Sequence, residues 1–107
     1  MTELEKEIES KLRKTVENRG GVCLKWVCPG WSGVPDRIIL LPGGRIYFVE
    51  TKRPKGGRLD KIQKWWKERL ERMGFWVFIA WDVEDIAWIE LTILSETKER
   101  EKRNDTD

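Results

Sequence analysis

Residues 33 to 52 read GVPDRIILLPGGRIYFVETK and contain two apolar runs on either side of a turn. The runs cover residues 38–41 and 46–49, and the string PGG at 42–44 joins them. Apolar runs separated by a short segment of proline and glycine are typical of a β-hairpin. The hairpin is the part of the chain around which we expect the other elements to be arranged.

The far end of this hairpin carries charged side chains. If residues 42–44 form a three-residue loop, Leu41 pairs with Arg45 and, counting back, Asp36 lies opposite Glu50. Opposed side chains stand about 5 Å apart at Cβ, a separation at which two carboxylates can hold one divalent cation. Lys52 points the same way as Glu50 because side chains two apart on a strand share a face.

Two explanations of these charges are open from the residues alone. Asp36 could be a turn residue after Pro35, with Glu50 and Lys52 as an ordinary surface ion pair. However, two like charges placed face to face are unfavourable unless something neutralises them. Lys52 supplies one positive charge, and a bound Mg²⁺ or Mn²⁺, which prefers oxygen ligands, would supply the rest.

Three short motifs in this order resemble a known nuclease superfamily. GVPDR at 33–37 and VETK at 49–52, followed by Gln63, are similar to the PD-(D/E)XK nucleases and in particular to their VRR-NUC branch, in its short stand-alone phage and bacterial form. The resemblance extends from about Glu5 to about Trp81. It implies an α/β fold with a restriction-endonuclease-like core in the order α-β-β-β-α-β, a mixed sheet flanked by helices.

The elements outside the hairpin are predicted from apolar spacing and from glycine stops. They are helices at 3–18 and 59–73, and strands at 22–27, 75–81 and 87–94. The strand at 75–81 is apolar on both faces, so we expect it to be central and, after a right-handed crossover, parallel to 45–52. The strand at 87–94 is an addition to the core. We expect one domain over residues 1–94 and a charged extension without catalytic residues over 95–107.

The resemblance implies roles for individual residues. Asp36, Glu50 and the carbonyl of Thr51 would bind one or two Mg²⁺ ions, for which Mn²⁺ could substitute. Glu9 on the first helix would assist directly or through water, with Glu5 as the alternative.

Two further side chains complete the expected catalytic site. Lys52 would position or deprotonate the attacking water, and Gln63 would orient a water or a phosphate. Some related nucleases have a tyrosine four residues after this glutamine, where the present chain has Lys67.

Composition limits the possible chemistry. The chain has 107 residues, two cysteines and no histidine, which excludes a Ser-His-Asp triad and histidine-dependent zinc sites. Cys23 and Cys28 are too far apart on one strand for a disulfide. No apolar run is as long as a membrane span and the N-terminus is charged, so we expect a cytoplasmic protein, of a bacterium or a phage-infected cell, without a membrane partner.

The distribution of charge favours nucleic acid as the partner. The formal net charge is only +2, but residues 45–72 contain ten basic and four acidic residues. Part of this excess could be an ordinary solvated helix face. The basic residues expected to bind nucleic acid are Lys25, Arg37, Arg53, Lys55 and Arg58.

These observations predict a metal-dependent endonuclease that uses no nucleotide cofactor. The sequence contains no recognisable base-reading module, so branched or otherwise structured DNA is the expected substrate. Stand-alone relatives act as homodimers on four-way junctions, and the tryptophans at 65, 81 and 88 could form an apolar dimer patch. A catalytically inactive DNA-binding module with the same fold is the first alternative. An unrelated α/β interaction protein, in which the charged residues never converge, is the second.

Overall fold

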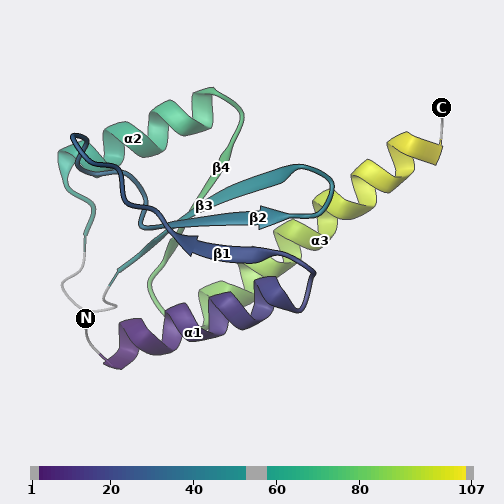
Figure 1. Cartoon of the computed structure of the whole chain (residues 1–107), viewed down its shortest axis with the longest axis horizontal. Helices are drawn as coiled ribbons and strands as arrows, with labels where there is room; N and C mark the ends of the chain where they lie inside the picture. Colours follow the sequence, from purple (N-terminus) through teal and green to yellow (C-terminus); the bar gives the residue numbers. More distant parts are fainter. Residues whose placement is uncertain (1–2, 53–57, 106–107) are drawn as a thin grey trace.

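The computed structural model describes residues 3–52 and 58–105. Three helices and four strands follow one another in the described ranges (Figure 1). They are α1 (Glu3–Glu17), β1 (Val22–Lys25), β2 (Arg37–Leu41), β3 (Arg45–Thr51), α2 (Lys61–Arg72), β4 (Trp76–Ala80) and α3 (Glu84–Asp105). This mixed α/β arrangement confirms the predicted fold class through its first six elements.

The four strands form one sheet in the order β1-β2-β3-β4. β2 pairs with β1 and with β3 in the antiparallel sense, and β4 pairs with β3 in the parallel sense. Leu41 faces Arg45 across the turn, which confirms the predicted three-residue loop. Gly43 and Gly44 both adopt positive φ (87° and 71°), a conformation that glycine reaches without steric cost.

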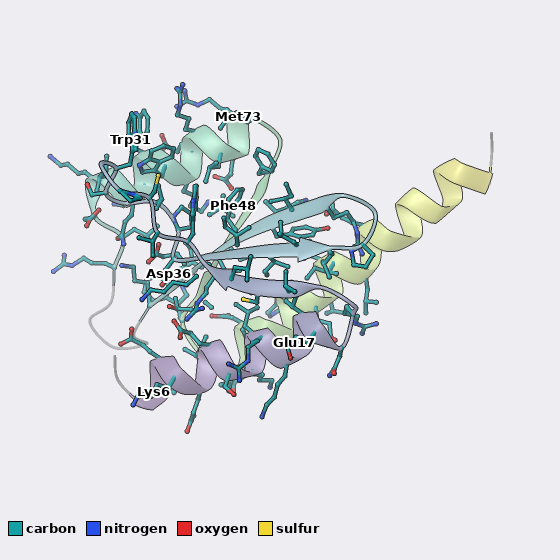
Figure 2. The ribbon with its side chains drawn as sticks, viewed as in Figure 1. Lys6, Glu17, Trp31, Asp36, Phe48 and Met73 are labelled. Atoms are coloured by element: carbon teal, nitrogen blue, oxygen red, sulfur yellow. The ribbon has the colours of Figure 1, made fainter. Side chains whose placement is uncertain are left out.

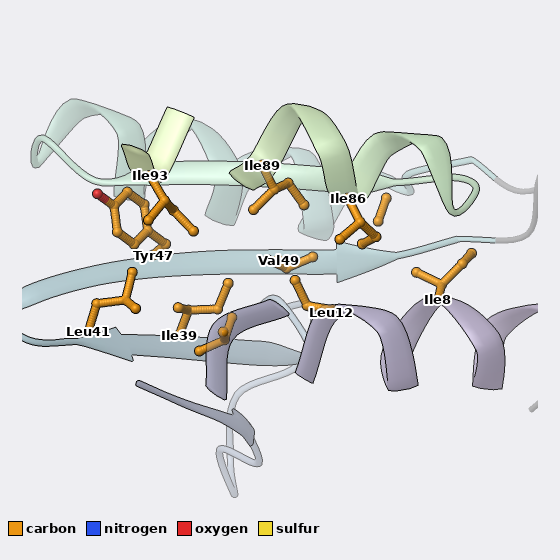
Figure 3. Packing of buried hydrophobic residues seen from close by; sticks show 11 residues of the cluster. Ile8, Leu12, Ile39, Leu41, Tyr47, Val49, Ile86, Ile89 and Ile93 are labelled. Atoms are coloured by element: carbon orange, nitrogen blue, oxygen red, sulfur yellow. The ribbon is translucent and has the colours of Figure 1, made fainter. Parts of the chain in front are cut away.

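The two faces of the sheet are covered differently, as Figure 1 shows. Odd-numbered residues of β2 and β3, including Ile39 and Val49, pack against α1 and α3 in a mainly aliphatic cluster (Figure 3). Phe48, on the opposite face of β3, packs against Leu70 of α2 and Val77 of β4. Because side chains alternate along a strand, Glu50 lies on the face of Phe48, beside α2.

The segment predicted as a final strand at 87–94 is instead part of α3. Ile86, Ile89 and Ile93 recur at helical spacing and are each only 1% exposed, since they form one side of the aliphatic cluster. The helix start is also marked by side chains. Asp85 donates its backbone N–H to the carboxylate of Asp82, and the Asp85 carboxylate accepts from the backbone N–H of Asp82. The β-branched residues favoured a strand, but packing at intervals of three and four determines a helix.

The placement of β4 also differs from the prediction. It runs parallel to β3, as expected, but it is the last strand of the sheet within the described residues rather than a central one. Its apolar pattern has another cause, because Val77 packs on the α2 side and Ala80 packs on the α1/α3 side. Both faces are therefore covered although one edge has no neighbouring strand.

The helix α3 continues through the predicted boundary at residue 94. Glu96, just beyond it, accepts hydrogen bonds from Tyr47 of β3 and Trp76 of β4. The division into a domain and an extension stays a prediction. Among the described residues, no helix has the length and apolar character that crossing a bilayer requires.

Candidate active site

Two carboxylates meet where β2 begins and β3 ends. The register of β2 and β3 ends with Arg37 and Val49, so Asp36 and Glu50 are the next residues outward, and the charge of Asp36 acts on Glu50. Asp36 lies between the layers formed by α2 and α1 (Figure 2). Its carboxylate accepts hydrogen bonds from the hydroxyl of Thr51 (2.8 Å) and from the backbone N–H of the same residue (3.2 Å). These bonds fix the Asp36 carboxylate against the end of β3.

Glu50 is the most electrostatically perturbed carboxylate of this site. The residue is 7% exposed, and its burial, followed by the negative charge of Asp36, raises the pKa of Glu50 from 4.5 to about 7. Lys52 acts in the opposite direction, with its ammonium nitrogen 3.8 Å from Glu50 Oε1. Burial also raises the pKa of Asp36, while its bonds to Thr51 lower it. The site therefore holds two acids whose ionisation the protein itself only partly compensates.

Gln63 reaches this pair from α2. Its side-chain Nε2 donates to Glu50 Oε1 at 3.4 Å, while its Oε1 accepts from the backbone N–H of Asp60 at 3.0 Å. Asp60 in turn accepts from the Gln63 backbone N–H, which completes a capping box at the start of α2. The side chain is thus held at both ends. Sequence analysis placed Gln63 near the sheet but missed Asp60, although an acid followed by Gln three residues later is a recognisable capping signal.

Glu9 is not brought to Glu50. It lies on α1, across the sheet, and its carboxylate binds the guanidinium of Arg37 at 2.6 Å. The negative charge of Glu9 nevertheless contributes to raising the Asp36 pKa, so the two groups interact through space. The alternative, Glu5, is half-buried on the same helix. Within residues 3–52 and 58–105, no three acidic or cysteine side chains form a group that could hold a metal ion.

Comparisons with known proteins bear on this geometry. No family model matches the sequence. The chain is 40% identical over 85 residues to "Putative nuclease p44" of Acyrthosiphon pisum secondary endosymbiont phage 1, an alignment that covers 79% of this chain and 89% of the relative. The structure of the present chain superposes on a solved VRR-NUC domain with a TM-score of 0.76. The two chains are 28% identical, and the match covers 82% of the present chain and 95% of the solved domain. The chain belongs to the VRR-NUC family of nucleases.

The basic residues expected to bind nucleic acid are arranged unequally around this VRR-NUC site. Lys25 is exposed at the end of β1 and lies beside Arg37 in the strand register. Arg37 is engaged with Glu9, and its buried Nε has no hydrogen-bond partner within the part of the chain that the structure describes. Arg58 is exposed just before α2, whereas Arg53 and Lys55 lie outside the described residues.

The donor set of the VRR-NUC site fits a hard divalent cation. Asp36, just before β2, and Glu50 of β3 offer carboxylate oxygens, and the carbonyl of Thr51 is the third donor expected from the sequence. Oxygen donors of this kind suit Mg²⁺, which keeps several waters and takes only one or two carboxylates. A cation bound nearby would favour the ionised form of Glu50, whose pKa is raised by burial and by the charge of Asp36.

The two cysteines take no part in this site. Cys23 and Cys28 are free and half-buried. Burial raises the pKa of the Cys23 thiol, which disfavours the reactive thiolate.

Proposed function

We propose that this VRR-NUC nuclease is a metal-dependent endonuclease that hydrolyses phosphodiester bonds in branched DNA. The observation that carries the proposal is the convergence of the half-buried Asp36 and the buried Glu50, with Lys52 3.8 Å from Glu50. Strongly perturbed acids that converge with a lysine are typical of catalytic sites.

Each side chain has a role in this scheme. Asp36, Glu50 and the Thr51 carbonyl would hold one or two Mg²⁺ or Mn²⁺ ions. When bound, the cation would supply positive charge that acidifies nearby water and offsets charge developing on the phosphate. The ammonium group of Lys52 would orient the attacking water and stabilise negative charge that develops on the phosphate. Its backbone N–H donates to Ala80 at 2.9 Å, which anchors the residue beyond the end of β3.

Gln63 and Glu9 would act less directly. The amide of Gln63 keeps Glu50 in position through the contact described above, and the fixed capping box limits its movement. Glu9 would act on the site through its bond to Arg37 and through its charge, at the opposite face of the sheet.

The substrate and assembly proposals rest on different features. The described fold presents no helix-turn-helix, in keeping with recognition of DNA shape rather than base sequence. Trp88 and Leu91 on α3 are 70% and 57% exposed, and their spacing of three places them on one side of the helix. An apolar patch of this kind supports a homodimer, in which two sites could cut the two strands of a four-way junction.

The test is cleavage of labelled four-way junction, splayed-arm and linear duplex DNA, with Mg²⁺ or Mn²⁺ compared with EDTA. Symmetrical nicks at the junction that need the metal are the expected result. Lys52→Ala should abolish cleavage, and Arg72→Ala is the control because Arg72 pairs with Glu68 on the exposed surface of α2. A fully active Lys52→Ala protein would overturn the mechanism. DNA binding without cutting under either metal would favour an inactive DNA-binding module.

Dimerisation is tested separately by sedimentation velocity. A dimer that Trp88→Ala dissociates would support the α3 patch. A monomer at working concentration, with and without junction DNA, would remove the basis for paired cutting.

A further inference from the structure

A second feature of the described surface lies beside the active site and has no part in the chemistry above. A pocket of about 480 Å³ opens between the loop that follows β1 and the first turns of α2. Its lining includes Trp31, Ser32, Lys61, Ile62, Trp65 and Trp66. The volume falls within the range of about 300–1,000 Å³ that holds small organic groups. Three of the residues that line this open pocket are tryptophans, so a large aromatic surface is exposed to solvent.

The tryptophans are held by specific contacts. Trp66 donates its indole N–H to the Ser32 carbonyl at 2.9 Å, which ties the loop to α2. Trp31 and Trp65 each meet Trp66 edge to face, with ring centroids 5.8 Å and 5.0 Å away. Trp31 is 61% exposed and Trp65 is 44% exposed. Trp66 therefore has a structural role, whereas the other two rings stay accessible to a ligand.

The pocket is joined to the active site through both of its walls. Ile62, which lines the pocket, directly precedes Gln63, whose amide contacts Glu50. On the other wall the chain passes from Ser32 through Gly33 to Asp36. Gly33 has a φ of +83°, and a Cβ there would come within 2.7 Å of Ile62, so loop and helix are in close contact at this point. Both walls of the pocket therefore continue along the chain into residues of the carboxylate site.

Charge at the pocket favours an anionic ligand. Lys61 is exposed and lines the opening, and the guanidinium of Arg69 lies 5.3 Å from the centre of the Trp65 ring. A nucleotide has a flat base that could stack on the tryptophans and a phosphate that could contact Lys61. Base stacking on an aromatic side chain is worth about 1–3 kcal/mol and requires a base that is not stacked in a duplex.

We propose that this pocket binds an unpaired nucleobase of the DNA, next to the phosphodiester that the carboxylate pair attacks. The proposal rests on the function proposed above in taking DNA as the ligand. Trp31 and Trp65 are the stacking residues, and Lys61 contacts a neighbouring phosphate. Preference for DNA with unpaired bases at a branch follows from this pocket and does not need a base-reading module.

The experiment measures binding without cutting. Wild-type protein in EDTA and Asp36→Asn protein are titrated against splayed-arm DNA that carries 2-aminopurine at an unpaired position beside the branch, and against a duplex in which the same base is paired. We expect the 2-aminopurine fluorescence to fall on binding only for the unpaired base. Trp31→Ala and Trp65→Ala should each weaken binding of the splayed-arm DNA about fivefold or more, with little change for the duplex.

The matched control is Trp76→Ala, which removes a tryptophan of β4 that is 48% exposed and does not line the pocket. Thermal unfolding of each variant shows whether it is folded. Equal weakening for both DNAs, or unchanged binding by folded Trp31→Ala and Trp65→Ala proteins, would overturn the proposal. Loss of a dimer in these two variants without loss of base selectivity would assign the pocket to a second copy of the chain and overturn it as well.

The two proposals can fail independently. Wild-type protein that cleaves no DNA while the unpaired base is still quenched selectively would remove the nuclease mechanism and leave the base pocket. Metal-dependent cleavage that Trp31→Ala and Trp65→Ala leave unchanged, together with unchanged binding, would remove the pocket alone.

Discussion

The two ends of the β2–β3 hairpin bury charge in opposite ways. At the turn end, Arg45 is 8% exposed and donates to the carbonyls of Pro42 and Ile93, both at 3.1 Å. Near it, Glu96 accepts from Tyr47 and from Trp76. At the other end, Asp36 and Glu50 face each other as two acids, and burial with mutual repulsion raises the pKa of Glu50 to about 7.

The difference separates polar groups that stabilise the fold from a pair of acids for which we propose a catalytic role. A buried guanidinium bound to neutral carbonyls ties the turn to α3 and has its own donors satisfied. Two opposed carboxylates cost stability in the absence of a cation, and nothing about the hairpin's folding requires them. Acids that cost stability in this way are typical of functional sites, so we expect this pair to take part in binding or catalysis.

The largest expected effect is at the acidic end. Asp36→Asn should reduce metal-dependent DNA cleavage by more than about a hundredfold, because the charge that binds the cation is lost. The amide oxygen can still accept from Thr51, and removal of the charge relieves repulsion with Glu50. We therefore expect a melting temperature in EDTA at or above that of the wild type. Cleavage assays and thermal unfolding measure the two effects. An active or strongly destabilised variant would contradict the idea that the acidic end contributes to activity and not to stability.

The turn end should respond in the reverse manner. Arg45→Met should lower the free energy of unfolding by about 2–4 kcal/mol, because two buried hydrogen bonds donated by a charged group are lost. Cleavage per folded molecule should stay close to wild type, since Arg45 lies at the far end of the strands from Glu50. Urea unfolding and cleavage rates at low temperature provide the comparison. A folded variant with impaired cleavage would show that the two ends are coupled.

The pH dependence of stability gives a smaller effect with a defined sign. The folded-state pKa of Glu50 is raised from 4.5 to about 7, so the folded protein holds this proton more tightly than the unfolded chain. The resulting stabilisation is fully present below about pH 4.5 and is lost as the pH rises to about 7. In EDTA this amounts to about 1–3 kcal/mol.

Glu50→Gln tests that assignment, because it should flatten this part of the pH profile in urea unfolding. Mg²⁺ should raise the melting temperature of the wild type more at pH 8 than at pH 5, since the cation competes with the proton. A profile that the substitution leaves unchanged would assign the titration to another group.

The smallest effect is expected for Tyr47→Phe. It removes the hydroxyl that binds Glu96, but Glu96 keeps the indole N–H of Trp76 at 3.0 Å. The loss in unfolding free energy should be about 1 kcal/mol, as for a single hydrogen bond. Equilibrium unfolding measures it, and Trp76→Phe in the same background shows whether the two donors act together. A loss as large as that of Arg45→Met would mean that Glu96 depends mainly on the tyrosine.

The hairpin was predictable because its determinants are local. A turn of three residues fixes the register, and the alternation of side chains then decides that Asp36 and Glu50 oppose each other. The same reasoning identified α1, α2 and the parallel pairing of β4. It was wrong at α3, where the β-branched isoleucines suggested a strand although their spacing matches a helix that covers the aliphatic cluster.

Contacts across the sheet were less accessible to sequence reasoning. Glu9 was expected at the metal, but the side chain of Arg37, on the same face of the sheet, captures it. The partner of a charged residue on α1 depends on how this helix packs against the sheet. Residue spacing in the sequence does not specify this packing. Asp60 was overlooked although its capping motif is visible in the sequence. The catalytic roles of the individual residues stay predictions until the variants are measured.

The short turn of the hairpin has a consequence for the order of folding. Closing a loop of three residues costs little entropy and is fast, whereas pairing β3 with β4 must wait for the crossover through α2. Asp36 and Glu50 therefore meet early, before the remaining strand is in place. Their repulsion is then part of the barrier to folding, and refolding in EDTA should be faster at pH 5 than at pH 8. The repulsion between the proposed catalytic acids would then also slow the folding of the chain.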